Sequence, residues 1–122
     1  ESWGLIHADI HQGNYVLLDR EIRPIDFSRC GFGFYLYDIG QSLGDLDASV
    51  RSPFFEGYTS IRSLPGSYQT RVETFFNLAT IENFAFHSTN PKEHEFLSRA
   101  VPYVVQHHLH PYLNNEDFLF QH

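Results

Sequence analysis

The sequence predicts an α+β fold that is mostly helical, with a small β-hairpin and loop portion followed by a helical bundle. Short apolar runs separated by turn residues occupy positions 1–35, and apolar residues at helical spacing follow. The length, 122 residues, suffices for one domain with a real core but not for two of similar size. We therefore expect a single domain over 1–122, divided into a β portion (1–35) and a helical portion (36–122).

The β portion contains the runs WGLIHAD, NYVLLD and EIRPIDF. Gly13 lies between the first two runs, and Asp19, Arg20 and Glu21 lie between the second and third, so we expect small strands linked by a loop and a hairpin. Pro24 has no backbone N–H to donate to a sheet. Its strand should therefore lie at an edge or be irregular at that point.

Helical spacing begins at about residue 36, with apolar residues at Leu36, Ile39, Leu43 and Leu46. Ser52 and Pro53 resemble the cap and the first-turn residue of a second helix that runs to about Ile61. The turn cluster SLPGS, residues 63–67, separates this helix from the next one.

The stretch from about Tyr68 to His87 is apolar at too many positions for a half-exposed helix. We expect it to be the central core helix. Asn90 and Pro91 then open a last helix, in which Pro102 marks a kink or a boundary.

Composition restricts the class of protein. Fifteen acidic against eight basic residues give a formal charge of −7, which suits a cationic small molecule or metal-bound phosphates better than nucleic acid. No run of the ~20 apolar residues that cross a bilayer is present, and no membrane partner is expected. The single cysteine, Cys30, cannot form an internal disulfide, which fits a cytoplasmic protein.

The segment HADIHQGN, residues 7–14, contains the densest group of reactive side chains and supports two interpretations. In the first, His7 and Asp9 bind iron together with a distant histidine such as His107 or His110, or with His11, as in an H-x-D metal-dependent oxygenase. Such sites usually lie in a barrel of many strands, whereas the residues after Phe34 are almost wholly helical. The scaffold therefore disfavours iron.

The second interpretation is phosphoryl transfer, which requires a carboxylate beside the acceptor hydroxyl and oxygen ligands for magnesium on the nucleotide phosphates. Asp9 would face the acceptor hydroxyl. Asn14, five residues on, and Asp26, after a short hairpin, would reach the metal. Gly13 lets the loop turn tightly beside that metal.

The ordered segments LIHADIHQGNYVLLD and RPIDFSRCGFGFYLYDIG resemble the catalytic half of the aminoglycoside phosphotransferase and choline kinase family, which has the protein-kinase-like fold. The family pattern is H-x-D-x-x-x-x-N, then I-D-F, then a helix that begins Y-D. The matching residues are His7, Asp9 and Asn14, then Ile25-Asp26-Phe27, then Tyr37-Asp38-Ile39.

This resemblance implies a role for each matching residue. Asp9 would be the catalytic carboxylate that orients the substrate hydroxyl and helps to deprotonate it, and His7 would support the loop by hydrogen bonding. Asn14 and Asp26 would hold Mg²⁺ and, through it, ATP. Asp38 would be a buried carboxylate that ties the first helix to the catalytic loop.

The sequence departs from the family in two respects. Arg29 stands where many relatives have an acidic residue, and Phe34-Tyr35 stands where they have Asp-Pro, which changes the neighbouring substrate surface. A kinase of this fold also holds ATP under an N-terminal lobe with a lysine, whereas the single lysine here is Lys92, downstream of the loop. We therefore expect the ATP lobe to belong to the parent chain upstream of Glu1, and the fragment alone to be inactive.

The implied activity is transfer of the ATP γ-phosphoryl group to a hydroxyl of an aminoglycoside, amino alcohol, sugar or amino acid by the full-length parent. The alternative is a non-catalytic kinase-like binding module. In relatives the helical region lines the acceptor site with carboxylates that meet cationic amines. The candidate substrate residues are Asp45, Asp47, Glu56 and Tyr58.

Overall fold

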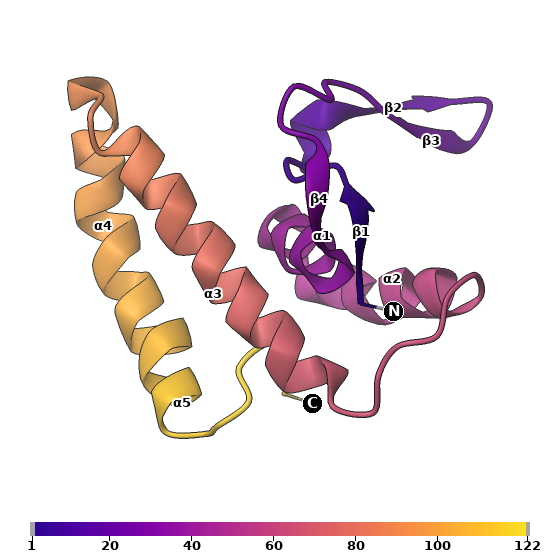
Figure 1. Ribbon diagram of the computed structural model, residues 1–122. Coiled ribbons are helices and arrows are strands. Elements are labelled where there is room, and N and C mark those ends of the chain that lie inside the picture. The colour runs from indigo at the N-terminus through magenta and orange to yellow at the C-terminus, as the bar shows by residue number, and fades with distance from the viewer. Residues whose placement is uncertain (1, 122) are drawn as a thin grey trace.

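A computed structural model describes residues 2–121, in which short strands come first and helices follow (Figure 1). The strands are β1 (Trp3–Ile6), β2 (Tyr15–Leu18), β3 (Glu21–Pro24) and β4 (Gly31–Phe34). The helices are α1 (Tyr35–Ser42), α2 (Arg51–Thr59), α3 (Tyr68–His87), α4 (His94–Val104) and α5 (His110–Leu113). No helix within the described residues is both long enough and apolar enough to cross a membrane.

Strands β2 and β3 form the expected antiparallel hairpin, with Leu18 opposite Glu21. The turn residues Asp19 and Arg20 both have positive φ, 51° and 64°, as a two-residue turn of the primed type requires. Pro24 lies opposite Tyr15 at the open end of this two-stranded sheet, where both strands are edges. The edge position expected for the proline strand is therefore confirmed.

The pairing of β1 with β4 was not anticipated from the sequence. β1 runs antiparallel to β4, with Trp3 opposite Phe34 and their rings 4.8 Å apart at nearly a right angle. The segment GFGF carries two glycines, which are depleted in strands, and so it lacks a strand signature. An added Cβ on Gly33 would lie 2.5 Å from the end of the Ile6 side chain, so a larger residue here would require Ile6 to move.

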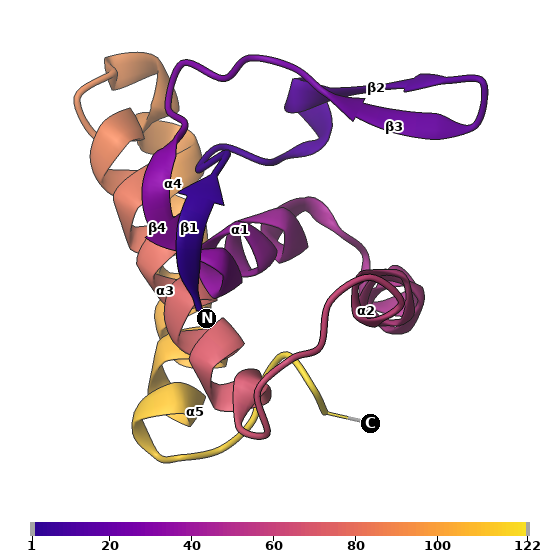
Figure 2. The same ribbon diagram turned by 45° about the vertical axis from the view of Figure 1, so that its right-hand side comes forward.

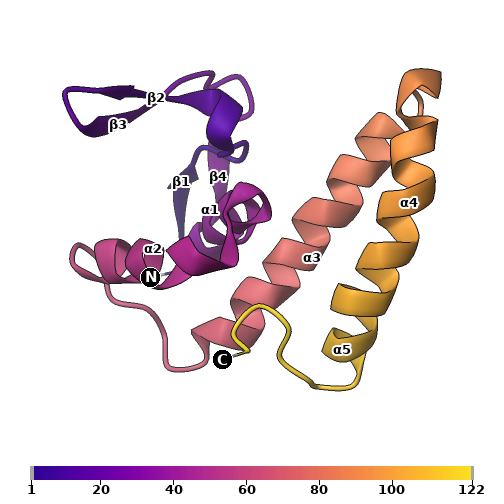
Figure 3. The same ribbon diagram turned by 180° about the vertical axis from the view of Figure 1, so that it is seen from behind.

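Helix α1 carries the centre of the core. Leu36 and Ile39 are buried in α1, and Leu43 is buried in the 3₁₀ turn Leu43–Asp45 that follows, so the helical spacing is confirmed as far as Leu43. Leu46 is half-buried but has an extended backbone. Figures 2 and 3 show α1 with α2 on one side of it and the α3–α4 pair on the other.

Helix α2 begins differently from the expectation. Asp47 caps a short 3₁₀ turn, Ala48–Val50, by accepting a hydrogen bond from the Ser49 N–H, and this turn leads directly into α2. Ser52 therefore lies inside the helix, where its hydroxyl bonds the Glu56 carboxylate. The prediction that Ser52 caps α2 was wrong, because the 3₁₀ turn Ala48–Val50 continues directly into the helix at Arg51.

Helix α3 has the predicted bounds, but only its first half is core. Buried residues are Val72, Glu73, Phe76 and Asn77, whereas Ile81 is 50% exposed and Phe86 is 77% exposed. The second half of α3 extends beyond the core and runs antiparallel to α4, so that residues 78–104 form an arm (Figures 1 and 3). The apolar residues of this half therefore need another explanation than the core.

The end of α4 contains Pro102, as expected for a kink or boundary. A π-helical turn, Val105–Leu109, follows the helix directly and leads into α5. The chain then folds back to α3, where the buried carboxylate of Glu73 accepts hydrogen bonds from the N–H groups of Phe118 and Leu119, at 2.8 and 2.9 Å. This contact holds the C-terminal segment against the foot of the arm.

Candidate active site

Asp9 and Asn14 are joined at the centre of the loop between β1 and β2. The Asn14 side-chain amide donates hydrogen bonds to the Asp9 carboxylate Oδ2 and to the Asp9 carbonyl, both at 2.9 Å. Asn14 is buried, and its own N–H donates to the His11 carbonyl at 2.8 Å. The loop therefore closes on itself and holds the Asp9 carboxylate in one orientation.

His7 supports this loop through both ring nitrogens. Its Nε2 donates to the Ile25 carbonyl at 2.8 Å, and its Nδ1 accepts from the Asp9 N–H at 3.2 Å. The Ile25 carbonyl can only accept, so the hydrogen lies on Nε2. Since the Ile25 N–H also donates to the Asn14 carbonyl at 2.8 Å, the segment that carries Asp26 is fastened beside the loop.

These contacts leave His7 without a ring nitrogen for a metal ion. Within residues 2–121, no group of three or more His, Cys, Asp and Glu side chains is arranged to hold a metal. The geometry thus gives no support to the iron site built on His7 and Asp9, with His11, His107 or His110 as a further ligand.

Asp38 connects helix α1 to the start of the loop. Its two carboxylate oxygens accept hydrogen bonds from the N–H groups of His7 and Ala8, each at 2.8 Å. Ala8 has φ 65°, a left-handed conformation that costs a non-glycine residue about 1–2 kcal/mol. The carboxylate stabilises this strained turn, and it does so from a half-buried position rather than the buried one expected.

Asp26 also has a left-handed backbone, with φ 55°. Its Oδ1 accepts from the Ser28 hydroxyl at 2.7 Å and from the Ser28 N–H at 3.3 Å. The side-chain hydrogen bond from Ser28, followed by the backbone one, lowers the pKa of this exposed carboxyl below its ordinary value. Asp26 is therefore ionised at neutral pH.

The side chains of Asn14 and Asp26 offer oxygen atoms of the kind that Mg²⁺ prefers. The Asn14 side-chain amide donates its hydrogen bonds to Asp9, which leaves its side-chain oxygen available to a metal ion. Asp26 supplies an ionised carboxylate. Mg²⁺ in nucleotide sites is usually held by one or two protein oxygens together with phosphates and water, so a larger protein cluster is not needed.

Arg29 is a site residue whose position the sequence did not predict. Its Nη1 lies 3.9 Å from Asp9 Oδ1, and His11 Nε2 lies 3.7 Å from the same oxygen. The residue that departs from the family pattern thus places a cation beside the candidate catalytic carboxylate. No local signal predicts this approach, because it depends on how the segment before β4 folds over the loop.

Asp9 and Arg29 line a cavity of about 870 Å³. The cavity lies between the candidate catalytic loop (residues 7–14), α1 and the arm. The sequence pointed to the loop side of this cavity. The opposite side consists of residues from α3 and α4, including Thr80, Phe84 and Tyr103. The sequence predicts that the apolar residues of α3 belong to a core, because no sequence pattern separates a core face from a cavity wall.

Of the four candidate substrate residues, Asp45 lines the cavity. Its Oδ2 accepts from the Gln12 N–H at 2.8 Å, and its carbonyl accepts from the Gln12 side-chain amide at 2.9 Å. Asp45 therefore connects the wall of the cavity to the loop of residues 7–14.

The other three candidates lie outside the cavity lining. The Asp47 carboxylate caps its own turn, and the Glu56 carboxylate accepts from a hydroxyl on the same helix at 3.0 Å. Tyr58 packs against the hydrophobic core, and burial raises the pKa of its phenol. The structure does not bring these three residues together with Asp9.

Comparison with known proteins defines the class. Residues 1–70, more than half of the chain, match the family model of the Phosphotransferase enzyme family, and the chain belongs to that family. The resemblance inferred from the loop motifs is therefore confirmed. The mostly helical α+β fold is likewise that of kinase-like phosphotransferases.

Individual relatives share part of the chain. An uncharacterized protein of Synechocystis sp. (strain ATCC 27184 / PCC 6803 / Kazusa) is 28% identical over 91 residues, 70% of this chain and 25% of that protein. An amicoumacin kinase, solved with AMP-PNP, Ca²⁺ and Ami, is similar at TM-score 0.53 and 26% identity over 60% of this chain. A microcompartment-associated aminopropanol kinase is similar at TM-score 0.51 and 34% identity over 63% of this chain.

The chain spans about a quarter of the length of these proteins, 25% of the first and 26% of each solved structure.

Proposed function

We propose that this chain is the catalytic-loop and acceptor-binding part of an ATP-dependent small-molecule kinase that phosphorylates a substrate hydroxyl. The observation that carries the proposal is the position of Asp9. Its carboxylate is fixed by Asn14 and borders a cavity large enough for a small-molecule acceptor. A carboxylate held in place at the mouth of such a cavity suits a group that must orient a hydroxyl.

In the proposed reaction the acceptor hydroxyl donates a hydrogen bond to Asp9. The acceptor oxygen forms a bond to the γ-phosphorus while the bond from that phosphorus to the bridging oxygen of ADP breaks, and ADP leaves with the electron pair. The hydroxyl proton passes to the Asp9 carboxylate. Asn14 keeps Asp9 oriented throughout, and His7 and Asp38 keep the loop from rearranging.

Asn14 and Asp26 would hold Mg²⁺, which neutralises charge on the nucleotide phosphates when bound. The metal and nucleotide contacts rest on the fit of these two oxygen ligands. One of the similar kinases was solved with a nucleotide analogue and a divalent cation, which supports the same chemistry here. ATP would be covered by a lobe of the parent chain outside residues 1–122, so that this fragment by itself is inactive. We place the activity in the cytoplasm, since the single cysteine is free and exposed.

The test is ATP consumption by the full-length protein against a panel of hydroxylated amines, sugars and amino acids. An Asp9→Asn variant should lose on the order of 10³-fold or more in kcat, because a positioned acid–base group contributes about 10²–10⁴-fold and the approach of the hydroxyl is also disturbed. The matched control is Asp19→Asn, in the exposed hairpin turn, which should keep full activity.

Equal turnover by the wild-type and Asp9→Asn proteins would contradict the role of Asp9. If no acceptor on the panel is phosphorylated, the alternative of a non-catalytic binding module is favoured. Magnesium-dependent ATP binding that survives both Asn14→Ala and Asp26→Ala would contradict the metal assignment.

A further inference from the structure

The cavity beside Asp9 has two walls of different chemistry. The wall formed by the catalytic loop and α1 is polar, with Asp9, His11, Arg29, Gln41 and Asp45. The wall formed by α3 and α4 carries five Phe and Tyr rings beside four polar residues: Phe76, Phe84, Phe86, Phe96 and Tyr103, with Thr80, Asn83, His87 and Arg99. A single cavity thus joins the candidate catalytic carboxylate to a set of aromatic rings.

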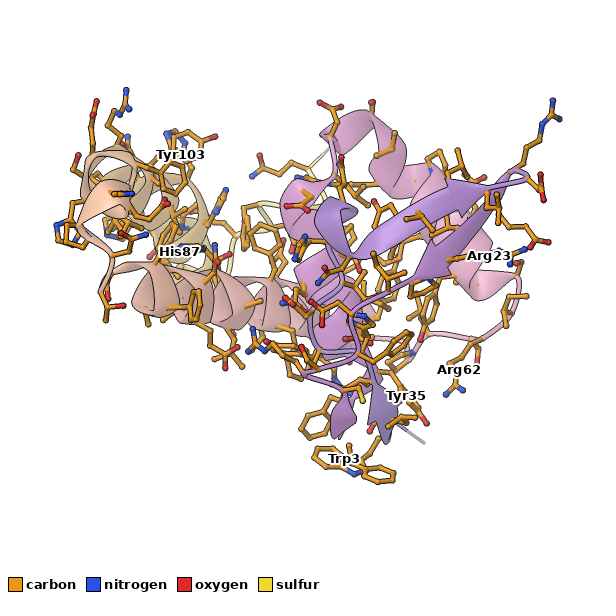
Figure 4. All side chains as sticks on the ribbon, turned by 90° about the horizontal axis from the view of Figure 1, so that it is seen from above. Trp3, Arg23, Tyr35, Arg62, His87 and Tyr103 are labelled. Atoms are coloured by element: carbon orange, nitrogen blue, oxygen red, sulfur yellow. The ribbon has the colours of Figure 1, made fainter. Side chains whose placement is uncertain are left out.

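The aromatic rings of the arm are exposed as well as apolar. Phe86 is 77% exposed, Phe96 is 52% exposed and Tyr103 is 58% exposed. Figure 4 shows His87 from α3 and Tyr103 from α4 together on this side of the molecule, far from Arg23 in the hairpin. Contiguous exposed apolar surface rimmed by polar groups is typical of a ligand-binding groove.

The guanidinium group of Arg99, on the same wall as the aromatic rings, also suits a planar ligand. Arg99 lines the cavity and pairs with the exposed Glu95 one helical turn away, at 3.4 Å. A guanidinium group stacks on aromatic planes, and aromatic rings pack edge to face or offset against one another. An aromatic group placed in the cavity against the wall formed by α3 and α4 would make both kinds of contact.

Two residues that line the cavity each have a buried polar atom without a hydrogen-bond partner among the described residues. The atoms are Oε1 of Gln41, on the polar wall, and Nδ1 of His108, whose ring stacks on Phe118. Each of these two atoms exposes less than 1 Å² of surface, so a ligand in the cavity could reach it only after a change of side-chain rotamer.

We propose, on the basis of the kinase function above, that the acceptor is an amphipathic alcohol. Its polar, hydroxyl-bearing end would lie at Asp9 and Asp45, and an aromatic ring would lie against Phe96 and Tyr103. The volume supports this assignment, since about 870 Å³ falls in the upper part of the range of about 300–1,000 Å³ that drug-sized ligands occupy. A small amino alcohol by itself would leave the aromatic wall in contact with water.

The experiment compares two acceptors that differ by one phenyl group, 2-amino-1-propanol and 2-amino-3-phenyl-1-propanol, in the full-length protein. The phenyl compound should have a kcat/KM at least about tenfold higher, with the difference mainly in KM, because ring contacts are made equally before and during transfer. Phe96→Ala should reduce this ratio to near one. Ile81→Ala is the matched control, since Ile81 is 50% exposed on the arm but outside the cavity lining, and it should keep the ratio.

Binding of the same two compounds, measured by calorimetry, separates this proposal from the kinase function. Tighter binding of the phenyl compound that is lost in Phe96→Ala supports the aromatic subsite even if neither compound is phosphorylated. Equal affinities and equal kcat/KM values, or a preference that persists in Phe96→Ala, would overturn it and leave the role of Asp9 unaffected. Tyr103→Ala serves as the second variant should Phe96→Ala fail to fold.

Discussion

The catalytic loop and the arm form opposite sides of one cavity and are built by different interactions. In the loop, residues 7–14, polar atoms of His7, Asp9 and Asn14 are paired with one another, with Ile25 just after β3, or with α1. The arm, residues 78–104, presents exposed aromatic rings, and an exposed hydrogen bond from Tyr37 to Glu82, at 2.6 Å, connects it to α1.

This difference follows from what each side has to do under the proposed function. A group that takes part in phosphoryl transfer must be held within a fraction of an ångström, and directional hydrogen bonds achieve that. An acceptor subsite gains binding energy from apolar contact, which is non-directional and tolerates change. The geometry of the loop should therefore change when a single polar atom is lost. The stability of the arm should depend on the contacts of Glu73 with the C-terminal segment.

The largest effect on stability is expected at Glu73, at the foot of the arm. Glu73→Ala should reduce the free energy of unfolding by about 4 kcal/mol, because the buried Leu119 N–H and the half-buried Phe118 N–H lose a charged acceptor at about 1.5 kcal/mol each and side-chain packing is also lost. Urea denaturation measures this. Glu73→Gln keeps an oxygen that accepts both bonds and should lose only about 1 kcal/mol. Equal losses in the two variants would contradict the hydrogen-bond explanation.

On the loop side, Asp38→Ala should reduce stability by about 2 kcal/mol, since the two N–H groups it bonds are only partly shielded from water. In the full-length protein kcat should fall on the order of 100-fold, because the loop is no longer held in its strained turn. Asp47→Ala removes a carboxylate that accepts the Ser49 N–H and hydroxyl and lies outside the cavity lining, and it should leave kcat unchanged. A normal kcat for Asp38→Ala would show that the loop positions itself.

The catalytic loop and the arm are connected through the contact of α1 with α3, and Gly40 lies where these two helices cross. A Cβ there would lie 2.7 Å from the Phe76 nitrogen and 2.8 Å from the Phe75 carbonyl carbon, so Gly40→Ala should move the helices apart and cost about 1–2 kcal/mol. Gly57→Ala, in α2, meets nothing within 4 Å and should instead stabilise by up to about 1 kcal/mol through helix propensity. Thermal unfolding of both variants checks the contrast, and similar shifts would rule out a steric requirement at Gly40.

The smallest effect is expected from pH at His108, beside the cavity. Burial, followed by the charge of His107, lowers the pKa of the His108 imidazole below its ordinary value of 6.5. The unfolded chain then binds a proton at higher pH than the folded chain, so this contribution to stability is present above about pH 6.5 and is lost as pH falls.

Unfolding measured between pH 5 and pH 7.5 should show a weaker pH dependence in His108→Phe than in the wild type. His110→Phe, at an exposed position, should retain the wild-type dependence. A His108→Phe profile identical to that of the wild type would show that other groups govern the acid response.

Local patterns were sufficient for much of this protein. The family follows from the ordered motifs around Asp9, Asn14 and Asp26, and the helix Tyr68–His87 follows from apolar content between a turn cluster and Asn90. The hairpin at Asp19 and Arg20 was predicted for the same reason. Each of these features depends on residues that are neighbours in the chain, where spacing alone determines which side chains share a face or a turn.

Three features required the tertiary structure: the pairing of β1 with β4, the approach of Arg29 to Asp9, and the aromatic wall of the cavity. Each depends on how segments distant in sequence dock. An apolar residue such as Phe84 has the same helical spacing whether it faces a core or a cavity, so the pattern cannot distinguish them. What decides between a core and a cavity is the segment that packs against this face of α3. Helix α1 packs at Gly40 against the first half of α3, where the buried residues of α3 lie, and the second half stays largely exposed.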